Sequence, residues 1–493
     1  MQHAVQSILE LYKKWKGKEA ASLDVLPQSG SERRYFRIHN AEGPTTIGTY
    51  GANIEENETF IYFSQEFRKK NLPVAIIHMV SDDNLFYLQE DFGDISLIDR
   101  LEKEGYSNSV YSLFKKSLEE LASLQVNGDK GLDYERCLTN KEFGKQAIMA
   151  DLLYFKYYFL DALRRPYDKQ QLIEDFEALS NYLTHAEYKF FMFRDFQSRN
   201  IMVTSHLSPS GGGNGEVVHF IDYQGGMKGA PQYDVASMLW QARANLPDDW
   251  KNNLLEDYMS AFEKIIATHV DRTIFRSQYN GYVLIRLLQV LGAYGFRGLF
   301  ERKAHFLTSI PLALKNLRWF IENQSMGIAL PEFRKVLDIC IADEIIEQFT
   351  PLQASEDNPL IIKINSFSYK NGIPGDSSGN GGGFVFDCRG ILNPGRLDEF
   401  KTLTGRDKSV KDFLEQQTRI SEFLNSVFDI VDITVEDYIK RNFESLVISF
   451  GCTGGQHRSV YAADALARHL RNKFKVKIQL NHREQNIVET KGV

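Results

Sequence analysis

The spacing of hydrophobic residues along the chain changes at two places. In the first 90 residues, short alternating segments at 35–38, 45–49 and 85–88 predict strands around one helix at 57–69. From residue 96 to about residue 348, hydrophobic residues recur mostly at helical spacing, in long runs such as 142–164 and 280–300. Only 201–204 and 217–222 are predicted as strands there. The pattern therefore predicts a small mixed lobe at 1–90 and a larger helical lobe at 91–350.

The second change follows a polar segment, QASEDNP, which ends in proline and is predicted to lie in a linker at 351–359. A new α/β pattern begins after it and defines a second domain at 360–493. Its predicted strands are 360–366, 383–386 and 446–450, and its predicted helices are 410–427, 435–442 and 460–473. The fold class expected for the whole chain is α/β (α+β) in two domains.

Length, net charge, apolar runs and cysteine spacing limit the classes of protein to which this chain can belong. The chain has 493 residues, which suggests two to four folding units. A net charge of -7 gives no overall attraction to nucleic acid or to an anionic membrane. We find no uninterrupted apolar run long enough to cross a bilayer, and the N-terminus is typical of an amphipathic helix, so we expect a cytoplasmic protein with no membrane partner. The four cysteines lie far apart in the sequence and are predicted to be free thiols.

The most informative segment is FMFRDFQSRNIMV, which begins at Phe191 and is followed, after a Gly/Ser-rich insertion, by VVHFIDYQGG. Phosphoryl transfer from ATP needs a carboxylate to orient the acceptor hydroxyl and oxygen ligands to hold Mg²⁺ against the phosphates. Asp195 suits the first role, and Asn200 and Asp222 offer the oxygens that Mg²⁺ prefers. The alternative is a loop acid that caps a turn and an unrelated strand-end acid. The RDxxxxN spacing favours the catalytic interpretation, with ATP and Mg²⁺ as cofactors.

Two segments near this motif have weaker signals. In LQEDFGDISL, where the two lobes would join, backbone groups around Glu90 and Asp91 could bind an adenine edge. In GAPQYDVASML, Asp234 begins a helix, and we expect it to support the catalytic loop from behind as a structural residue.

Together these pieces resemble the aminoglycoside-phosphotransferase/choline-kinase superfamily. They are most similar to its AmgK-type kinases, which phosphorylate N-acetylmuramate and N-acetylglucosamine at the anomeric hydroxyl. The resemblance covers residues 1 to about 335 and depends on SERRYFRI, LQEDFGD, FRDFQSRNIM, HFIDYQ, APQYDVAS, LLQVLGAYGF and IPLALKNL. It implies a bilobal protein-kinase-like fold, a sugar 1-phosphate product, and the roles given above for Asp195, Asn200 and Asp222.

Two positions depart from the family pattern. The usual histidine of the catalytic loop is Phe193 here, and we expect this side chain to pack rather than react. The usual lysine of the third strand has no counterpart in TTIGTYGA, so Arg33 or Arg34 is expected to neutralise the nucleotide phosphates. The predicted nucleotide-binding residues are Ser29, Gly30, Ser31, Arg33, Arg34, Glu90 and Asp91.

The second domain contains a strand, the loop Cys452-Thr-Gly-Gly-Gln-His-Arg458-Ser459, and then a helix. Glycines allow a tight loop, amides point inward at the helix N-terminus, and His457 and Arg458 add positive charge, so a phosphate group is the expected ligand. Cys452 and Arg458 also have the C-x5-R spacing of cysteine-dependent phosphatases. Phosphate binding without turnover is the favoured interpretation because the sequence shows no placed general acid.

Residues 361 to about 484 are similar to the C-terminal domain of the RapZ family of RNase adaptor proteins, through INSFSYKNGIP, FVFDCRGILNPG, LTGRDKSVKDFL and GCTGGQHRSVY. The resemblance implies a domain that binds glucosamine-6-phosphate and, in some relatives, a small RNA. The implied sugar-phosphate site comprises Asp387, Arg389, Cys452, Thr453, Gly454, Gly455, His457, Arg458 and Ser459. An RNA partner depends here on one local basic segment, 468–483, which suits a solvated helix and strand equally well.

The sequence therefore predicts an ATP-dependent kinase of a sugar, N-acetylmuramate or N-acetylglucosamine in cell-wall recycling, joined to a sensor of an amino-sugar phosphate. The alternative is a non-catalytic nucleotide-binding RNA adaptor or regulator of the RapZ type. The oligomeric state and the acceptor hydroxyl are not determined by the sequence. If the two domains are coupled, glucosamine-6-phosphate should change the kinase parameters.

Overall fold

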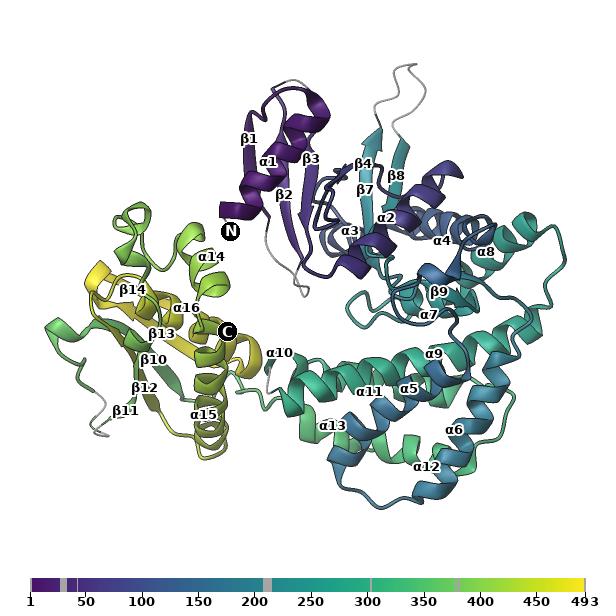
Figure 1. Ribbon diagram of the computed structural model, residues 1–493. Coiled ribbons are helices and arrows are strands. Elements are labelled where there is room, and N and C mark those ends of the chain that lie inside the picture. The colour runs from purple at the N-terminus through teal and green to yellow at the C-terminus, as the bar shows by residue number, and fades with distance from the viewer. Residues whose placement is uncertain are drawn as a thin grey trace. The chain divides into compact units, whose positions relative to one another are not determined.

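The computed structural model describes residues 2–26, 33–41, 43–206, 215–301, 304–376, 379 and 382–491. The chain forms two compact units (Figure 1). The first contains Met1–Ala293 and Leu312–Ala342, and the second contains Tyr294–Pro311 and Asp343–Val493. The linker predicted at 351–359 stays a prediction.

The first unit begins with a five-stranded antiparallel sheet in the order β1-β2-β3-β5-β4. Its strands are β1 Ser22–Val25, β2 Arg34–His39, β3 Thr46–Tyr50, β4 Ile77–Val80 and β5 Phe86–Glu90, and its helices are α1 Gln2–Lys16 and α2 Ile54–Lys69. The hydrophobic stripe of α1, which includes Ile8 and Tyr12, packs against Phe36, Ile38 and Leu88 of the sheet. Gly48 of β3 lies so close to Ile8 that a Cβ atom there would be 2.6 Å from the isoleucine side chain. The predicted strands at 35–38, 45–49 and 85–88 and the predicted helix at 57–69 are present as β2, β3, β5 and α2.

The rest of the first unit is mainly helical, as predicted. Its principal helices are α3 Leu97–Glu104, α4 Asn108–Asp129, α5 Lys145–Phe155, α6 Lys169–Thr184, α7 Gln232–Leu239, α8 Asp248–Ile266, α9 Arg272–Gly295, α11 Ile310–Asn323 and α12 Pro331–Cys340. Two small antiparallel pairs interrupt them, β6 Phe190–Met192 with β9 Met227–Gly229 and β7 Ile201–His206 with β8 Gly215–Phe220. These pairs position the candidate site.

The second unit is built around a five-stranded sheet in the order β11-β12-β10-β13-β14. The first four strands in this order run parallel, and β14 is antiparallel to β13. The strands are β10 Ile361–Ser368, β11 Gly383–Asp387, β12 Ser445–Cys452, β13 Lys477–His482 and β14 Ile487–Lys491. The helices are α10 Ala304–Leu307, α13 Asp343–Phe349, α14 Lys408–Gln417, α15 Ile420–Lys440 and α16 Arg458–Phe474. Buried residues of the sheet and of α14, α15 and α16 form one hydrophobic core.

Three element predictions need correction. The predicted helix at 142–164 is α helical only over Lys145–Phe155 and continues as a π-helical and a 3-10 turn. The predicted helices at 410–427 and 435–442 are divided at the wrong place. The first helix ends before Thr418, and α15 then runs without interruption from Ile420 to Lys440. Thr418 is extended, and its hydroxyl accepts a hydrogen bond from the Ile420 backbone N–H. Val427, Val431 and Val435 keep the helical spacing of four residues and are buried, so β-branched residues did not interrupt the helix.

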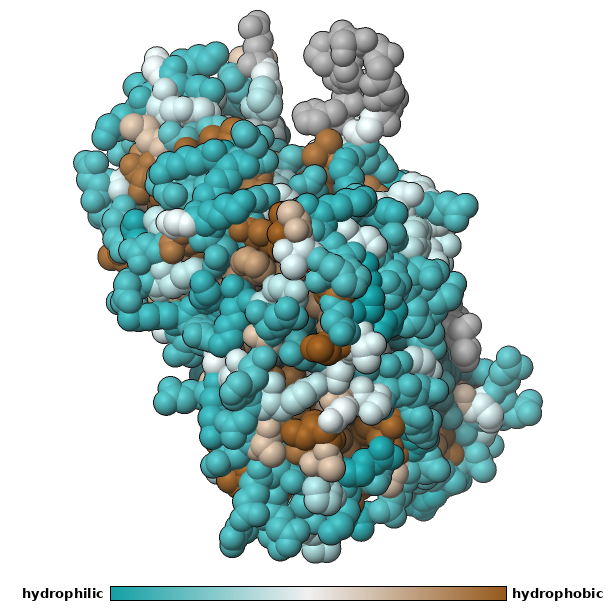
Figure 2. Space-filling model, turned by 90° about the vertical axis from the view of Figure 1, so that its right-hand side faces the viewer, coloured by the Kyte–Doolittle hydropathy of each residue, from teal (hydrophilic) through white to brown (hydrophobic). Residues whose placement is uncertain are grey.

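One helical segment, Arg272–Phe300, is long and apolar enough to cross a membrane by length and composition. Its most apolar stretch is 56% buried inside the protein, and core helices of soluble proteins pass the same test. The face of the protein seen in Figure 2 is largely hydrophilic, with hydrophobic residues in small separate groups.

Candidate active site and anion-binding loop

The three residues predicted to carry out phosphoryl transfer lie together. The antiparallel pairing of β7 with β8 places Ile201 opposite Phe220, so Asn200 and Asp222 meet at the open end of this hairpin. The side-chain N–H group of Asn200 donates to the Asp195 backbone carbonyl at 2.9 Å and to Asp222 Oδ2 at 3.3 Å. One amide therefore links the loop that contains Asp195 to the acid that follows β8.

Two arginines hold the Asp195 carboxylate. Arg286 Nη2 donates to Oδ1 at 3.0 Å, and Arg199 Nη2 donates to Oδ2 at 2.9 Å. Burial acts to raise the pKa of Asp195, but the charges of Arg286 and Arg199 outweigh it, and the pKa lies below its ordinary value. Asp195 is therefore ionised at neutral pH and can accept a hydrogen bond from a hydroxyl group.

Arg286 is the site residue that the sequence analysis missed. It lies in α9, 91 residues after Asp195, and only 7% of it is exposed. Its Nη1 group also donates to Gln289 Oε1 at 2.8 Å. A single arginine inside the apolar run YVLIRLLQVL is the signal that could have identified it, because a buried cation needs a partner.

Asp234 supports the catalytic loop from behind, as predicted. Its carboxylate accepts hydrogen bonds from the backbone N–H groups of Phe193 at 2.8 Å and Arg194 at 2.9 Å, and from Gln125 Nε2 at 2.9 Å. Complete burial raises the pKa of Asp234 to about 6, although these donors act to lower it. Arg194 has a φ of 78°, a conformation that a β-carbon disfavours, so the loop needs this anchoring.

Phe193 takes the position of the usual histidine and is completely buried. Its ring packs edge-on against Phe196, Phe220 and Tyr223 at centroid distances of 5.2, 6.2 and 6.0 Å. The predicted packing role of Phe193 is confirmed.

Arg33, rather than Arg34, lies beside the acid of α2. The guanidinium of Arg33 donates to the Glu56 carbonyl at 3.1 Å and approaches Glu56 Oε1 to 3.4 Å, and Arg33 is only 4% exposed. Gln224 Nε2 in turn donates to Glu56 Oε1 at 3.2 Å and to Asp222 Oδ1 at 2.8 Å. Side chains thus connect Arg33 to Asp222. Ser29, Gly30 and Ser31 lie outside the described residues.

The Asp91 carboxylate is occupied by protein groups. Arg37 donates to both of its oxygens, at 2.6 and 3.1 Å, and the Thr45 hydroxyl donates at 2.6 Å. Burial acts to raise the pKa of Asp91, but the hydrogen bonds from Arg37 and Thr45 outweigh this effect. The pKa of Asp91 therefore lies below its ordinary value. The side chain therefore ties β2 to the end of β5, where Glu90 Oε2 accepts a hydrogen bond from the Ile76 backbone. Adenine binding by the backbone here stays a prediction.

In the second unit, β12 leads through the predicted loop directly into α16. Cys452 is buried at the start of the loop, and its sulfur lies 3.2 Å from both Ser459 Oγ and the Gly455 backbone nitrogen, which donates to it. Gly455 has a φ of 65°, and a Cβ atom there would lie 2.9 Å from the Ser368 backbone nitrogen. Thr453 and Gly454 are the exposed residues at the tip of the loop.

The charged residues of this loop are engaged with the protein. Arg458 Nη1 donates to the carbonyl groups of Arg389 at 3.2 Å and Ile391 at 2.7 Å, and His457 Nε2 lies 2.8 Å from the Phe400 carbonyl. Arg389 and Asp387 pair with each other at 2.7 Å. These contacts brace the loop, and sugar-phosphate binding by all nine predicted residues stays a prediction.

The basic segment at 468–483 is divided between two elements, and RNA binding by it stays a prediction. It covers the end of α16 and all of β13, and Lys473 is neutralised by Asp432 at 2.8 Å. His469 Nε2 also lies 2.8 Å from this carboxylate. The four cysteines are free thiols, as predicted.

Comparison with known proteins identifies both parts of the chain. Residues 27–269 match the family described as the phosphotransferase enzyme family, and residues 360–486 match the RapZ C-terminal domain. A nucleotide-binding protein of Endomicrobium trichonymphae is 38% identical over 176 residues, which are 32% of this chain and 58% of that protein. A nucleotide-binding protein of Glaesserella parasuis serovar 5 is 30% identical over 241 residues, which are 48% of this chain and 76% of that protein.

The chain spans about half the length of the first two curated relatives, 58% of the Endomicrobium protein and 43% of a nucleotide-binding protein of Shewanella halifaxensis. Among solved structures, an ethanolamine kinase of Plasmodium vivax matches with a TM-score of 0.43 at 14% identity, over 67% of this chain and 89% of that chain.

Proposed function

We propose that the chain is an ATP-dependent sugar kinase, because residues 27–269 match the phosphotransferase enzyme family and residues 360–486 match the RapZ C-terminal domain. Its second domain would bind an amino-sugar phosphate. The observation that supports the kinase most strongly is the single amide of Asn200, which bonds to both the Asp195 loop and Asp222.

The residues present suit a magnesium ion. Asn200 and Asp222 would hold it through oxygen atoms, because the hydrogen bonds of Asn200 use its nitrogen, and the ion would neutralise charge on the nucleotide phosphates. Among the described residues, no cation forms an ion pair with Asp222. The described part of the chain also has no cluster of three His, Cys, Asp or Glu side chains that could hold a metal. Two protein ligands, completed by phosphate oxygens and water, are typical of magnesium in kinases.

On the acceptor side, Asp195 would act on the hydroxyl group, and two arginines would control Asp195. Asp195 would accept a hydrogen bond from the acceptor hydroxyl and take its proton as the new P–O bond forms, while the bond from the γ-phosphorus to the bridging oxygen breaks and ADP leaves. Arg286 would keep Asp195 ionised and in place. Arg199 is exposed, so a substrate hydroxyl could replace its contact with Asp195 at little cost.

On the nucleotide side, we propose that Arg33 takes the role of the absent lysine. It is a buried cation paired with an acid of α2, and Gln224 connects that acid to Asp222. Such a chain of contacts would align the cation with the phosphates and the metal.

The acceptor is proposed to be N-acetylmuramate or N-acetylglucosamine, phosphorylated at the anomeric hydroxyl in cell-wall recycling. The AmgK-like motifs and the amino-sugar phosphate implied for the second domain both support an amino sugar. The test is transfer of radiolabelled phosphate from ATP to a panel of amino sugars, neutral sugars, choline and aminoglycosides, with the product identified. A labelled amino-sugar 1-phosphate is expected, and labelling of choline or an aminoglycoside alone would exclude this acceptor.

A further inference from the structure

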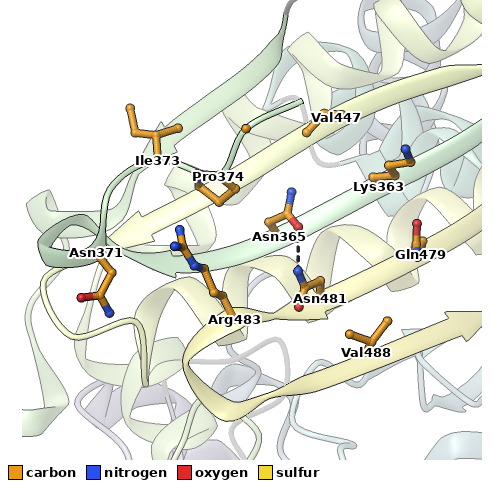
Figure 3. Close-up of a pocket in the computed structure, with 11 residues that line it drawn as sticks. Lys363, Asn365, Asn371, Ile373, Pro374, Val447, Gln479, Asn481, Arg483 and Val488 are labelled. Atoms are coloured by element: carbon orange, nitrogen blue, oxygen red, sulfur yellow. Dashed lines mark hydrogen bonds between the residues drawn. The ribbon is translucent and has the colours of Figure 1, made fainter. Parts of the chain in front are cut away.

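The second unit has a pocket on the face of its sheet that points away from the hydrophobic core. Side chains alternate between the two faces of a strand. Ile362, Ile364, Ile478 and Leu480 are buried in the core with α16, so the residues between them lie on the other face. There they line a pocket of about 490 Å³, within the range of small-molecule sites (Figure 3). The lining residues are Lys363, Asn365, Asn371, Ile373, Pro374, Gly375, Val447, Gln479, Asn481, Arg483 and Val488.

The pairing of β10 with β12 and β13 sets the polar side chains of the pocket side by side across neighbouring strands. Asn365 of the central strand β10 stands opposite Ser449 of β12 and Asn481 of β13. Asn365 Nδ2 donates to Ser449 Oγ at 3.3 Å. Asn481 Nδ2 donates to Asn365 Oδ1 at 3.3 Å, as Figure 3 shows. In the next row, Lys363 stands opposite Gln479, whose side chain has no hydrogen-bond partner among the described residues. The pocket therefore has a floor of fixed amides with unused donors and acceptors.

The charges around this floor have one sign. Lys363 and Arg483 are the charged residues among the described residues that line the pocket, and both are cationic. Arg483 Nη1 also donates to the Gly372 carbonyl at 3.2 Å, which fixes the loop whose Ile373 and Pro374 form the opposite wall (Figure 3). Val447 and Val488 add apolar surface. A ligand with an anionic group is therefore favoured.

We propose that this pocket binds a sugar that carries a carboxylate or phosphate group. The amides would exchange hydrogen bonds with ring hydroxyls, which need both donors and acceptors, while Lys363 and Arg483 would face the anion and Val447 and Val488 the apolar side of the ring. The site is separate from the anion-binding loop, because its lining contains none of the residues from Cys452 to Ser459. Neither the kinase activity nor phosphate binding at that loop is needed for it.

The test is calorimetric titration of the full chain with three matched probes: glucose, glucuronate and glucose 6-phosphate. At least one anionic probe should bind about tenfold or more tightly than glucose, and whichever binds more tightly decides between carboxylate and phosphate. Lys363→Met and Asn481→Leu should each weaken that binding about tenfold, with unchanged thermal unfolding. The matched control is Lys440→Met, at an exposed lysine at the end of α15 and outside the pocket, which should leave this binding unchanged. Ser459→Ala shows separately how much of the measured binding belongs to the anion-binding loop.

Three results would overturn the proposal. They are no binding of either anionic probe, equal binding of glucose, and loss of binding in Ser459→Ala but not in the pocket variants. Both side chains are half-buried on an open sheet face, so folding should tolerate the substitutions. If Asn481→Leu lowers the unfolding temperature, Lys363→Met decides alone.

Discussion

Asp195 is the residue on which the proposed chemistry depends, and two arginines in different environments control its ionisation. The Arg286 side chain is 9% exposed, whereas the Arg199 side chain is 55% exposed. Water screens an exposed ion pair strongly and a buried one weakly. Arg286 should therefore contribute most to the lowered pKa of Asp195, although both arginines are within hydrogen-bond distance.

Arg286→Met should move the acid limb of the pH profile of kcat/KM to higher pH. An opposite charge favours the ionised carboxylate and lowers its pKa, so removing that charge raises the pKa, and the variant should lose more activity at pH 5 than at pH 8. Arg286→Lys should restore most of the profile, and Arg199→Met should shift the limb less. An acid limb in Arg286→Met identical to the native one would contradict this electrostatic role.

Arg33 and Arg34 are adjacent, which gives a matched pair of variants. Arg33→Met should raise KM for ATP about tenfold or more, because a charge-assisted contact to phosphate contributes roughly 1.5–3 kcal/mol. Arg34→Met should change KM for ATP much less, since Arg33 is the residue paired with Glu56. Steady-state kinetics with ATP as the varied substrate measures both, and equal effects would contradict the assignment to Arg33.

At the scale of elements, the β7–β8 hairpin and the strand, loop and helix around Cys452 could be predicted from sequence because both are local. Asn200 and Asp222 meet through the pairing register of a single hairpin. Arg286 was missed for a different reason. Its place inside an apolar run indicates a buried cation, but the sequence does not show which acid it pairs with, because Asp195 lies 91 residues away. The break at Thr418 was missed because hydrophobic spacing continues across it. Strand β14 also escaped prediction, and β13 was anticipated only as part of the basic segment 468–483.

The loop from Cys452 to Ser459 should bind phosphate without hydrolysing it. A cysteine-dependent phosphatase needs a cysteine sulfur that can attack the phosphorus and an arginine that binds the phosphate. Here Cys452 is only 2% exposed, and the Arg458 guanidinium donates to backbone carbonyls instead. We expect no phosphate release from p-nitrophenyl phosphate or glucosamine-6-phosphate, and glucosamine-6-phosphate affinity should be similar in Cys452→Ser. Hydrolysis that is lost in Cys452→Ser would show that the phosphatase interpretation is the correct one.

At the scale of the whole molecule, one helix belongs to both units. Residues up to Ala293 of α9, including Arg286, lie in the first unit, and the following residues, Tyr294–Pro311, lie in the second. Coupling between the two predicted activities is a hypothesis that a ligand titration tests.

Saturating glucosamine-6-phosphate should change kcat or KM of the kinase by about fivefold or more, the lower end of typical allosteric coupling. Ser459→Ala should weaken this response, because Ser459 supports the loop through Cys452. Kinase parameters that stay constant across a saturating titration, with binding confirmed by calorimetry, would exclude coupling.

The central claim is that Asp195, Asn200 and Asp222 form the site of phosphoryl transfer. Its most direct test is the rate of phosphate transfer from ATP to the accepted sugar in Asp195→Asn. Asp338→Asn serves as the control, since Asp338 is also paired with an arginine, at the surface of α12 in the same unit. We predict a loss of about 10²–10⁴-fold in Asp195→Asn and native activity in Asp338→Asn, with both variants folded. Transfer at the native rate in a folded Asp195→Asn would contradict the claim.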